Sequence, residues 1–281
     1  MSEFDMAQEP EASEARHGAP SPSLARYWST FDVTTAPFVH AGDRRLIESR
    51  GVRDFRFGSL DEFVRSEAFG RPGGGLHLGL LPMPFVGNLA TADVFVLLLN
   101  PGFETADYVA DTDPDLHAAE VRTLYQTLDD VEFPFIFLDP RFCWSGGYRW
   151  WESKLRDVTR QFALDHGIRY YEALSRVASR VAAIEVFPYH SSSGPAGLER
   201  LPSSAAAREF VRDNLVPRAR DGELTLIVTR AAAAWGLSIA DDDGQNIVVY
   251  SGAETRAAYL TSLSRGGAAI AARLRVVRAV S

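Results

Sequence analysis

Val94-Phe-Val-Leu-Leu-Leu99, followed directly by Asn100-Pro-Gly-Phe103, is the stretch that decides the fold. The six apolar residues have the length of a β-strand, and Asn-Pro-Gly is a turn signal that ends it. Because the run is apolar at every position, both faces of the strand are expected to be buried, as in the centre of a parallel sheet. The spacing predicts a strand over residues 92–99.

Outward from this strand, further apolar runs alternate with helical patterns. Strands separated by helices imply right-handed crossovers, so the chain is expected to form a three-layer α/β/α fold with a central, mainly parallel, four-stranded sheet. The other three strands are predicted at 183–187, 223–229 and 246–250, with a short additional strand at 133–138. Helices are predicted at 60–69, 116–128, 150–165, 170–182, 204–215, 231–235 and 267–277.

Composition indicates an ordinary globular protein with an atypical N-terminus. The chain has 281 residues, 46% of them hydrophobic, and a formal net charge of −8. Residues 1–23 are acidic and poor in large apolar groups, so we predict a disordered tail followed by a single domain over 24–281. The overall acidity counts against indiscriminate binding to a phosphate backbone, although it leaves room for a local basic face.

Membrane and secreted classes are not expected. No apolar run approaches the roughly 20 residues of a membrane helix, and the acidic start lacks the pattern of a secretory signal. The single cysteine, Cys143, excludes a disulfide framework within the chain and fits a reducing compartment. The sequence therefore predicts a cytoplasmic protein.

Several catalytic chemistries lack their motifs. There is no G-x-G-x-x-G after a strand, no Walker loop, no H-E-x-x-H and no G-x-S-x-G. One cysteine cannot supply the P-C-x-x-C of a zinc deaminase. We therefore expect neither a cofactor nor a metal.

Polar residues follow the predicted strands at the edge where α/β sheets bind ligands. Asn100 would stand at the mouth of the sheet, and the permissive Gly102 leaves the following backbone N–H groups free to face a ligand. The four strand ends are Asn100-Pro-Gly-Phe103, Pro188-Tyr-His-Ser191, Thr229-Arg230 and Ser251-Gly252.

An Asn-Pro-Gly at the end of a buried strand resembles the first motif of the uracil-DNA glycosylase superfamily, in its mismatch-specific and single-strand-selective branches. Those branches have Gly-x-Asn-Pro-Gly, and Leu98 stands here in place of the first glycine. The segments Leu138-Asp-Pro-Arg-Phe142, Trp150-Trp151 and Glu185-Val-Phe-Pro-Tyr-His-Ser191 resemble a bacterial offshoot associated with phage defence. Members of that offshoot attack hypermodified, glucosylated hydroxymethylcytosine.

This resemblance implies a monofunctional DNA glycosylase that flips out a modified pyrimidine and leaves an abasic site, with uracil or damaged-pyrimidine repair as the alternative. Asn100 would position the attacking water, because an oxocarbenium-like sugar needs an oriented water more than a strong base. The N–H groups around Gly102 and Phe103, together with His190, would stabilise the departing base. Tyr189 and His190 stand where uracil-selective relatives present a base-reading Asn.

Other residues are expected to contact the base or the DNA. Trp144 and Tyr148 are the aromatic candidates for the base pocket, whereas Trp150 and Trp151 are predicted to be core anchors. The last motif of the superfamily, His-Pro-Ser or Asn-Pro-Ser, is missing. The predicted DNA contacts are Ser191, Arg230, Ser251, Gly252, Arg256, Tyr259 and Arg265. DNA is the expected partner, and we expect a monomer.

Two competing functions stay open from the sequence. Asp139 followed by Glu152-Ser-Lys154 resembles the elements of a metal-dependent nuclease, but a helix points residues two apart in different directions. A non-catalytic module that senses modified bases is the other alternative.

Overall fold

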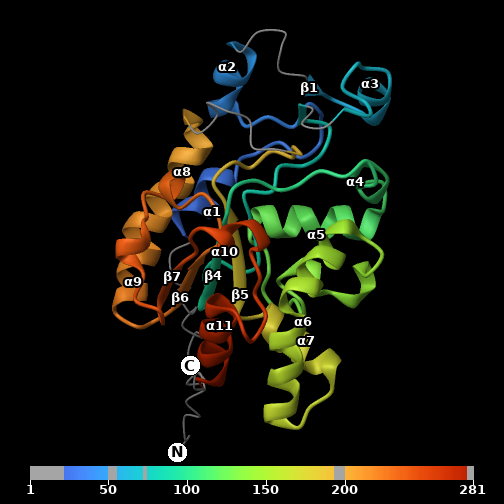
Figure 1. Ribbon diagram of the computed structural model, residues 1–281. Helices are drawn as coiled ribbons and strands as arrows, with labels where there is room; N and C mark the ends of the chain where they lie inside the picture. The colour runs from blue at the N-terminus through green and yellow to red at the C-terminus, as the bar shows by residue number, and fades with distance from the viewer. Residues whose placement is uncertain (1–21, 50–55, 72–74, 193–199, 277–281) are drawn as a thin grey trace, which may run out of the picture.

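The computed structural model describes residues 22–49, 56–71, 75–192 and 200–276 (Figure 1). The predicted disordered tail, 1–23, lies outside the described residues except for its last two. Helix α1 (Ser23–Trp28) begins there and contributes Leu24, Ala25 and Trp28 to a hydrophobic core cluster.

The main sheet has five strands in the order β3-β5-β4-β6-β7. Neighbours are parallel except β3, which pairs antiparallel with β5, so the predicted four-stranded sheet is wrong by one edge strand. The missed strand is only two residues long and follows Pro84, and prolines in a sheet are confined to edges and strand starts. The five strands of the main sheet are β3 (Phe85–Val86), β4 (Val94–Leu98), β5 (Val181–Glu185), β6 (Thr225–Val228) and β7 (Ile247–Val249). A second, parallel pair joins β1 (Arg56–Phe57) to β2 (Leu76–His77).

Helices surround this sheet. The α-helices after α1 are α2 (Ala41–Ser49), α3 (Leu60–Val64), α4 (Asp107–Ala110), α5 (Pro114–Tyr125), α6 (Gly146–His166), α7 (Tyr170–Ala178), α8 (Pro202–Phe210), α9 (Val216–Arg220), α10 (Ala253–Ala257) and α11 (Arg265–Arg275). Shorter turns are the 3₁₀ segments η1 (Ile136–Leu138), η2 (Pro140–Phe142), η5 (Ala232–Trp235) and η6 (Ile239–Asp241), and the π-turn η4 (Val211–Leu215).

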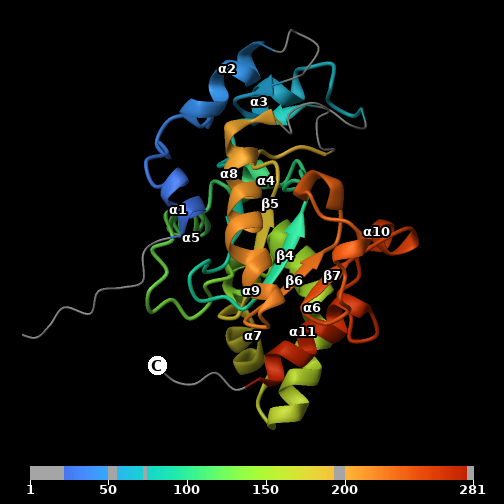
Figure 2. The same ribbon diagram turned by 90° about the vertical axis from the view of Figure 1, so that its left-hand side faces the viewer.

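Strand β4 is buried at every residue, as its apolar run predicts. Its side chains alternate between two core clusters, because successive residues of a strand point to opposite faces. Phe95 and Leu97 pack in the cluster that includes α1, α8 and η4, and Val94, Val96 and Leu98 pack in the one with α6, α7 and α11. Accordingly, α8 and α9 lie on one side of the sheet, with α6 and α7 on the other (Figures 1 and 2).

Three predicted elements are corrected. The predicted strand at 133–138 is wrong, because the end of this buried apolar run forms η1, which packs against α6. Periodicity alone cannot distinguish such a short apolar run from a strand. The helix predicted to reach 182 ends at Ala178, because Val181 already pairs with Val94 in the sheet. Helix α6 begins four residues earlier than predicted, since the Ser145 hydroxyl accepts a hydrogen bond from the N–H of Tyr148 and caps it.

Arg180 fastens the C-terminal helix to the sheet. Its guanidinium pairs with the Asp93 carboxylate, with Nη2 2.6 Å from Oδ2 and Nε 3.1 Å from Oδ1. The same group donates to the carbonyls of Arg273, Leu274 and Val276 at the end of α11, at 2.8, 2.8 and 3.1 Å. The two ion-pair side chains are only 10% and 13% exposed. The buried guanidinium of Arg180, just before β5, therefore links Asp93, just before β4, to the end of α11, the last described helix.

None of the helices in the described part of the chain combines the length and apolar character needed to span a bilayer.

Candidate functional site

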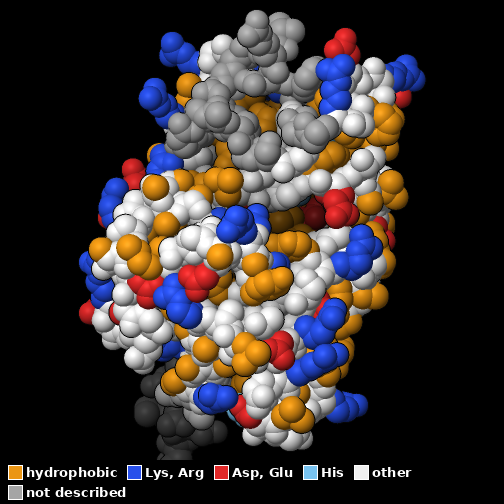
Figure 3. Space-filling model, viewed as in Figure 1, with side chains coloured by type: hydrophobic (Ala, Val, Ile, Leu, Met, Phe, Trp, Pro, Cys, Tyr) orange, Lys and Arg blue, Asp and Glu red, His pale blue; other side chains and the backbone are white. Residues whose placement is uncertain are grey.

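A cavity of about 420 Å³ opens at the carboxyl ends of β4 and β5. Its walls come from β4, β5, the loop 99–104, α4, α5 and the first turns of α6. The space-filling view shows a hollow near the centre of the face, with acidic and hydrophobic side chains at its edge (Figure 3). Of the predicted site residues, Asn100, Gly102, Phe103, His190, Ser191 and Arg230 line this cavity.

The amide of Asn100 is held in one orientation. Its Nδ2 lies 2.9 Å from the carbonyl oxygens of Pro101 and Ser191 and 3.0 Å from the Ser191 hydroxyl. A carbonyl oxygen can only accept, so the atom facing these two carbonyls must be the –NH2 nitrogen. Among the described residues no group hydrogen-bonds to Oδ1, so this acceptor is left for a ligand or a water in the cavity.

Donors lie next to that acceptor. Within the described residues, the backbone N–H groups of Gly102 and Phe103 make no hydrogen bond, as the sequence analysis anticipated for this turn. Phe103 is half-buried, and its ring stacks on that of His77. The loop after β4 thus presents one fixed amide oxygen and two unused N–H donors.

His190 lies across the cavity mouth from the same loop. Its Nδ1 is 2.9 Å from the carbonyl oxygen of Gly102, which requires Nδ1 to carry the hydrogen. In a neutral ring Nε2 then accepts a hydrogen bond, and in a protonated ring it donates one. The prediction that strand ends β4 and β5 bring Asn100 and His190 together is confirmed.

Tyr189 points the other way, and its predicted contact with the base is wrong. The side chain is 1% exposed and does not line the cavity. Its hydroxyl donates to the carboxylate of Asp43 at 2.7 Å and accepts from the N–H of His40 at 3.1 Å. Burial, and next the Asp43 charge, raise the pKa of Tyr189 well above its usual value.

Tyr189→Phe is therefore expected to affect stability and not ligand chemistry. Removing the hydroxyl deprives the fully buried Asp43 of a donor, and the free energy of unfolding should fall by about 1–3 kcal/mol. Urea denaturation followed by circular dichroism measures this change. Tyr171→Phe, which removes an exposed hydroxyl bonded to Glu132, is the matched control and should stay within about 0.5 kcal/mol. A loss of ligand binding without a loss of stability would contradict this structural role.

The aromatic assignments are partly corrected. Trp144 and Tyr148 do not line the cavity, whereas Trp150, predicted to be a core anchor, is 41% exposed and does. Trp151 is buried in a core cluster, as predicted, and also lines the cavity. The early start of α6 causes this, because it places Gly146 and Gly147 at the cavity wall and turns the two tryptophans toward it. A Cβ on Gly147 would clash with the ring of Phe137, so the close approach of this helix depends on glycine.

One wall of the cavity is acidic, which the sequence analysis missed. Asp107 and Asp111 come from α4 and its end, Glu104 from the loop before it and Glu120 from α5. Burial raises the pKa of Asp107. Burial, followed by the charges of Asp111 and Asp107, raises the pKa of Glu120 to about 8. These carboxyls come from three segments between residues 104 and 120, and the fold brings them to one wall of the cavity.

Glu185 was also missed. It ends β5, lines the cavity and is 9% exposed. Burial raises the pKa of Glu185 well above its usual range, with Arg230 opposing the shift. A signal existed in the sequence, since a carboxyl inside the apolar run 183–187 is costly unless it has a purpose.

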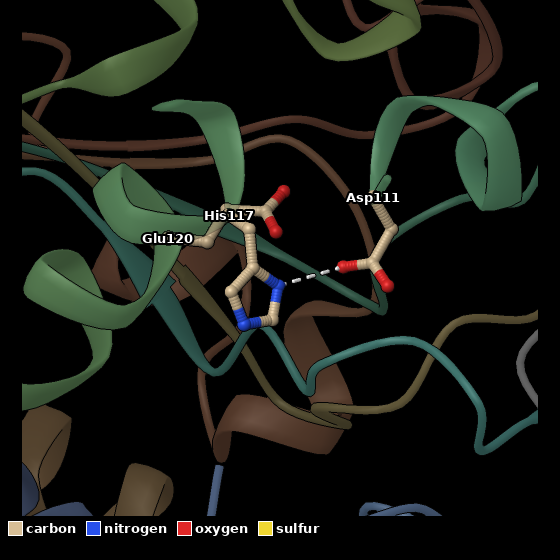
Figure 4. Close-up of side chains that lie close together, drawn as sticks. All are labelled: Asp111, His117 and Glu120. Carbon is tan, nitrogen blue, oxygen red and sulfur yellow. Dashed lines mark hydrogen bonds and ion pairs between the residues drawn. The ribbon is translucent and has the colours of Figure 1, made fainter. Parts of the chain in front are cut away.

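Asp111 and Glu120, together with His117 of α5, meet the spacing of a metal site. The ligand atoms of Asp111, His117 and Glu120 lie within 4.8 Å of one another, and the His117 ring points toward Asp111 (Figure 4). His117 Nδ1 and Asp111 Oδ1 are 3.1 Å apart, a hydrogen bond in itself. The cluster is half-exposed, and its imidazole and carboxylate already satisfy each other.

The predicted DNA contacts fall into two groups. Arg230 is exposed at the cavity rim, with Arg256, Tyr259, Ser251 and Gly252 on the exposed surface beyond it. The last two have partners within the fold. Ser191 is buried and accepts a hydrogen bond from the Asn100 amide, so it is positioned to hold the site. Arg265 is exposed and pairs with Asp242 and Glu254, and its contact with DNA stays a prediction.

The nuclease elements are separated from the cavity. Asp139 pairs with Arg141, and Glu152 pairs with Arg156 and accepts a hydrogen bond from Tyr170. Lys154 donates to the carbonyl of Ala257. None of the three lines the cavity, so the described structure brings together no nuclease-type acid and lysine set.

Comparison with known proteins yields no relative: no protein-family model, no curated protein and no solved structure matches this chain.

Proposed function

We propose that the protein is a monofunctional DNA glycosylase that excises a modified pyrimidine and leaves an abasic site. The observation that carries this proposal is the Asn100 amide, which lines the cavity and whose –NH2 is anchored by two carbonyls, while no described residue hydrogen-bonds to Oδ1. An acceptor fixed in this way suits the holding of one water molecule. Because the amide cannot ionise, its proposed role is to orient the water by accepting a hydrogen bond from it.

The proposed reaction needs two further groups. Cleavage of the N-glycosidic bond gives an oxocarbenium-like sugar, and negative charge grows on the departing base. The water held by Asn100 attacks the sugar carbon, while the N–H groups of Gly102 and Phe103 and the ring of His190 face the leaving base. Donors aimed at developing charge are each worth roughly 3–4 kcal/mol in a dry site.

The size and charge of the cavity favour a large, neutral, hydroxylated base. Its volume of about 420 Å³ is in the range of small-molecule sites, about 300–1,000 Å³. Carboxyl oxygens accept hydrogen bonds from hydroxyl groups, and Asp107, Asp111 and Glu120 supply them on one wall. This supports glucosylated hydroxymethylcytosine of phage DNA as substrate, and hence antiviral defence, ahead of uracil repair.

Other expectations complete the proposal. Helices on both sides of the mixed sheet support the three-layer α/β/α arrangement of the uracil-DNA glycosylase superfamily. The only lysine in the chain, Lys154, is bonded to Ala257, so no Schiff base and no strand cleavage are expected. We propose a cytoplasmic monomer that acts on DNA.

The test is base release from defined duplexes. End-labelled DNA containing glucosylated hydroxymethylcytosine, uracil or unmodified cytosine is incubated with the protein and then treated with hot alkali, which cuts only at abasic sites. We expect alkali-dependent cleavage of the glucosylated duplex and none without alkali. Cleavage before alkali would favour a nuclease. Tight binding of the glucosylated duplex without base release would favour a sensor of modified DNA.

A further inference from the structure

One imidazole and two carboxylates converge beside the cavity. The ligand atoms of Asp111, His117 and Glu120 lie within 4.8 Å of one another, and the ring of His117 faces Asp111 with the Glu120 carboxylate next to it (Figure 4). Zinc binds nitrogen and oxygen donors at about 2.0–2.2 Å, so the donors of a tetrahedral site stand about 3.4 Å apart. Small side-chain rotations therefore suffice to bring all three donors to one ion.

The turn between α4 and α5 sets the positions of these donors. His117 and Glu120 are three residues apart on α5, and residues at this spacing lie on the same face of a helix. Asp113 caps the first turn of that helix with its side chain. Asp111 ends α4 two residues earlier, and its N–H donates to the carbonyl of Asp107. Hydrogen bonds of the local fold thus fix the backbone from which the three donors project.

The hydrogen bond between His117 and Asp111 leaves the third member of the set without a partner. Among the described residues, no group hydrogen-bonds or forms an ion pair with the partly exposed Glu120 carboxyl. Glu104 on the same wall, in contrast, has Arg149 3.8 Å away. Two carboxylates this close repel each other, and a divalent cation between them replaces the repulsion by attraction.

The chemistry of the donors indicates the class of ion. Mg²⁺ and Ca²⁺ prefer oxygen ligands alone, whereas an imidazole beside carboxylates suits Zn²⁺. Three protein ligands leave a fourth position open, as in catalytic zinc sites. Asp111 and Glu120 line the cavity, so an ion held by them lies at its wall. The sequence analysis expected no metal because the spacing D-x5-H-x2-E matches none of the motifs it tested.

We propose that Asp111, His117 and Glu120 bind one Zn²⁺ ion at the wall of the cavity, with a water molecule or a hydroxyl oxygen of the cavity's ligand in the fourth position. Binding displaces the hydrogen from Nδ1 of His117, and the neutral ring then carries its hydrogen on Nε2. The site goes beyond the proposed function, because none of the three side chains takes part in the cleavage step.

Zinc binding is measured on the untagged full-length protein, after dialysis against a chelator and then against chelator-free buffer. Isothermal titration calorimetry with Zn²⁺ alone should show one ion per chain. Saturating Zn²⁺ should raise Tm on the order of 5 °C, since an ion that binds only the folded chain stabilises it. X-ray absorption at the zinc edge should show one imidazole, oxygen ligands and no sulfur.

His117→Gln and Glu120→Gln should each weaken Zn²⁺ binding by at least about 100-fold. Each variant loses a ligand, and even a group that only supports a ligand is worth about 10–100-fold. The matched controls, His166→Gln and Glu209→Gln, change exposed residues of α6 and α8 and should bind like the wild type. Cys143→Ser should do so too, which tests the exposed thiol as a competing ligand.

The site is overturned if the wild type binds no Zn²⁺, if binding is unchanged in His117→Gln and Glu120→Gln, or if it is lost in Cys143→Ser. Tighter binding of Mg²⁺ or Ca²⁺ than of Zn²⁺ would also overturn it. Thermal unfolding of the metal-free variants checks their folding. Should either ligand variant fail to fold, the absorption spectrum of the wild type decides, because a spectrum without imidazole contradicts the site.

The proposed glycosylase is judged separately. Zinc binding that depends on His117 and Glu120, without base release from any duplex, would uphold the site and refute the glycosylase. Base release by a protein that binds no Zn²⁺ would refute the site alone.

Discussion

Replacing Asn100 by alanine is expected to lower the rate of base release on the order of 10²–10³-fold under single-turnover conditions. The side chain holds the acceptor that orients the attacking water, and no other side-chain amide lines the cavity among the described residues. A loss of this size corresponds to about 3–4 kcal/mol in activation free energy. Affinity for a substrate duplex in which a 2′-fluoro substituent on the target nucleotide slows cleavage should change far less, because the water is needed for the reaction and not for base recognition.

Two controls isolate this effect. Asn214→Ala removes an exposed amide on η4 and should leave the rate unchanged. Thermal unfolding of Asn100→Ala checks that losing the bonds to Ser191 and Pro101 has not unfolded the loop. If the folded variant releases bases at the wild-type rate, the proposed mechanism is wrong. If it keeps its biological effect without base release, the protein acts as a sensor.

Arg180→Ala is expected to lower the free energy of unfolding by about 3–5 kcal/mol. The substitution removes the guanidinium from beside the nearly buried Asp93 carboxylate. It also takes the donors from three carbonyls at the end of α11. Both losses fall inside the protein, where water compensates poorly. Urea denaturation monitored by circular dichroism measures the change.

Arg176→Ala is the matched control. Arg176 lies in the last turn of α7, four residues before Arg180, and is exposed, so its loss should cost within about 0.5 kcal/mol. Arg180→Lys keeps the charge but not the five donors, and we expect it to recover only part of the loss. A wild-type stability for Arg180→Ala would mean that the C-terminal helix is held by its apolar face alone.

The sheet illustrates where local patterns suffice. The β4 run is apolar at each position and is followed by the turn signal Asn-Pro-Gly, which together predict a strand buried on both faces, and the structure agrees. The start of β5 was misplaced because the sequence Val-Ala-Ala suits either a helix or a strand, and pairing with Val94 decided between them. Strand β3 follows a proline and has two residues, too few for any periodicity.

In the candidate site, too, some residues could be predicted from the local sequence and others depended on tertiary contacts. Asn100 and His190 could be anticipated because both come directly after central strands, and the ends of parallel strands meet at one edge. The orientation of Tyr189 could not be anticipated, since it depends on a hydrogen bond to Asp43, 146 residues away in the chain. Nor could the tryptophan positions, which depend on the residue at which α6 begins.

By itself, the order of apolar and polar residues determined a largely parallel α/β sheet with an Asn-Pro-Gly turn at its ligand-binding edge, because strand burial and turn chemistry act between neighbours in the chain. Only the tertiary structure decided which side chains share the cavity. Glu185, Glu120 and Asp107 come from a strand and two separate helical regions, and their burial and pKa depend on contacts between elements that no local pattern specifies.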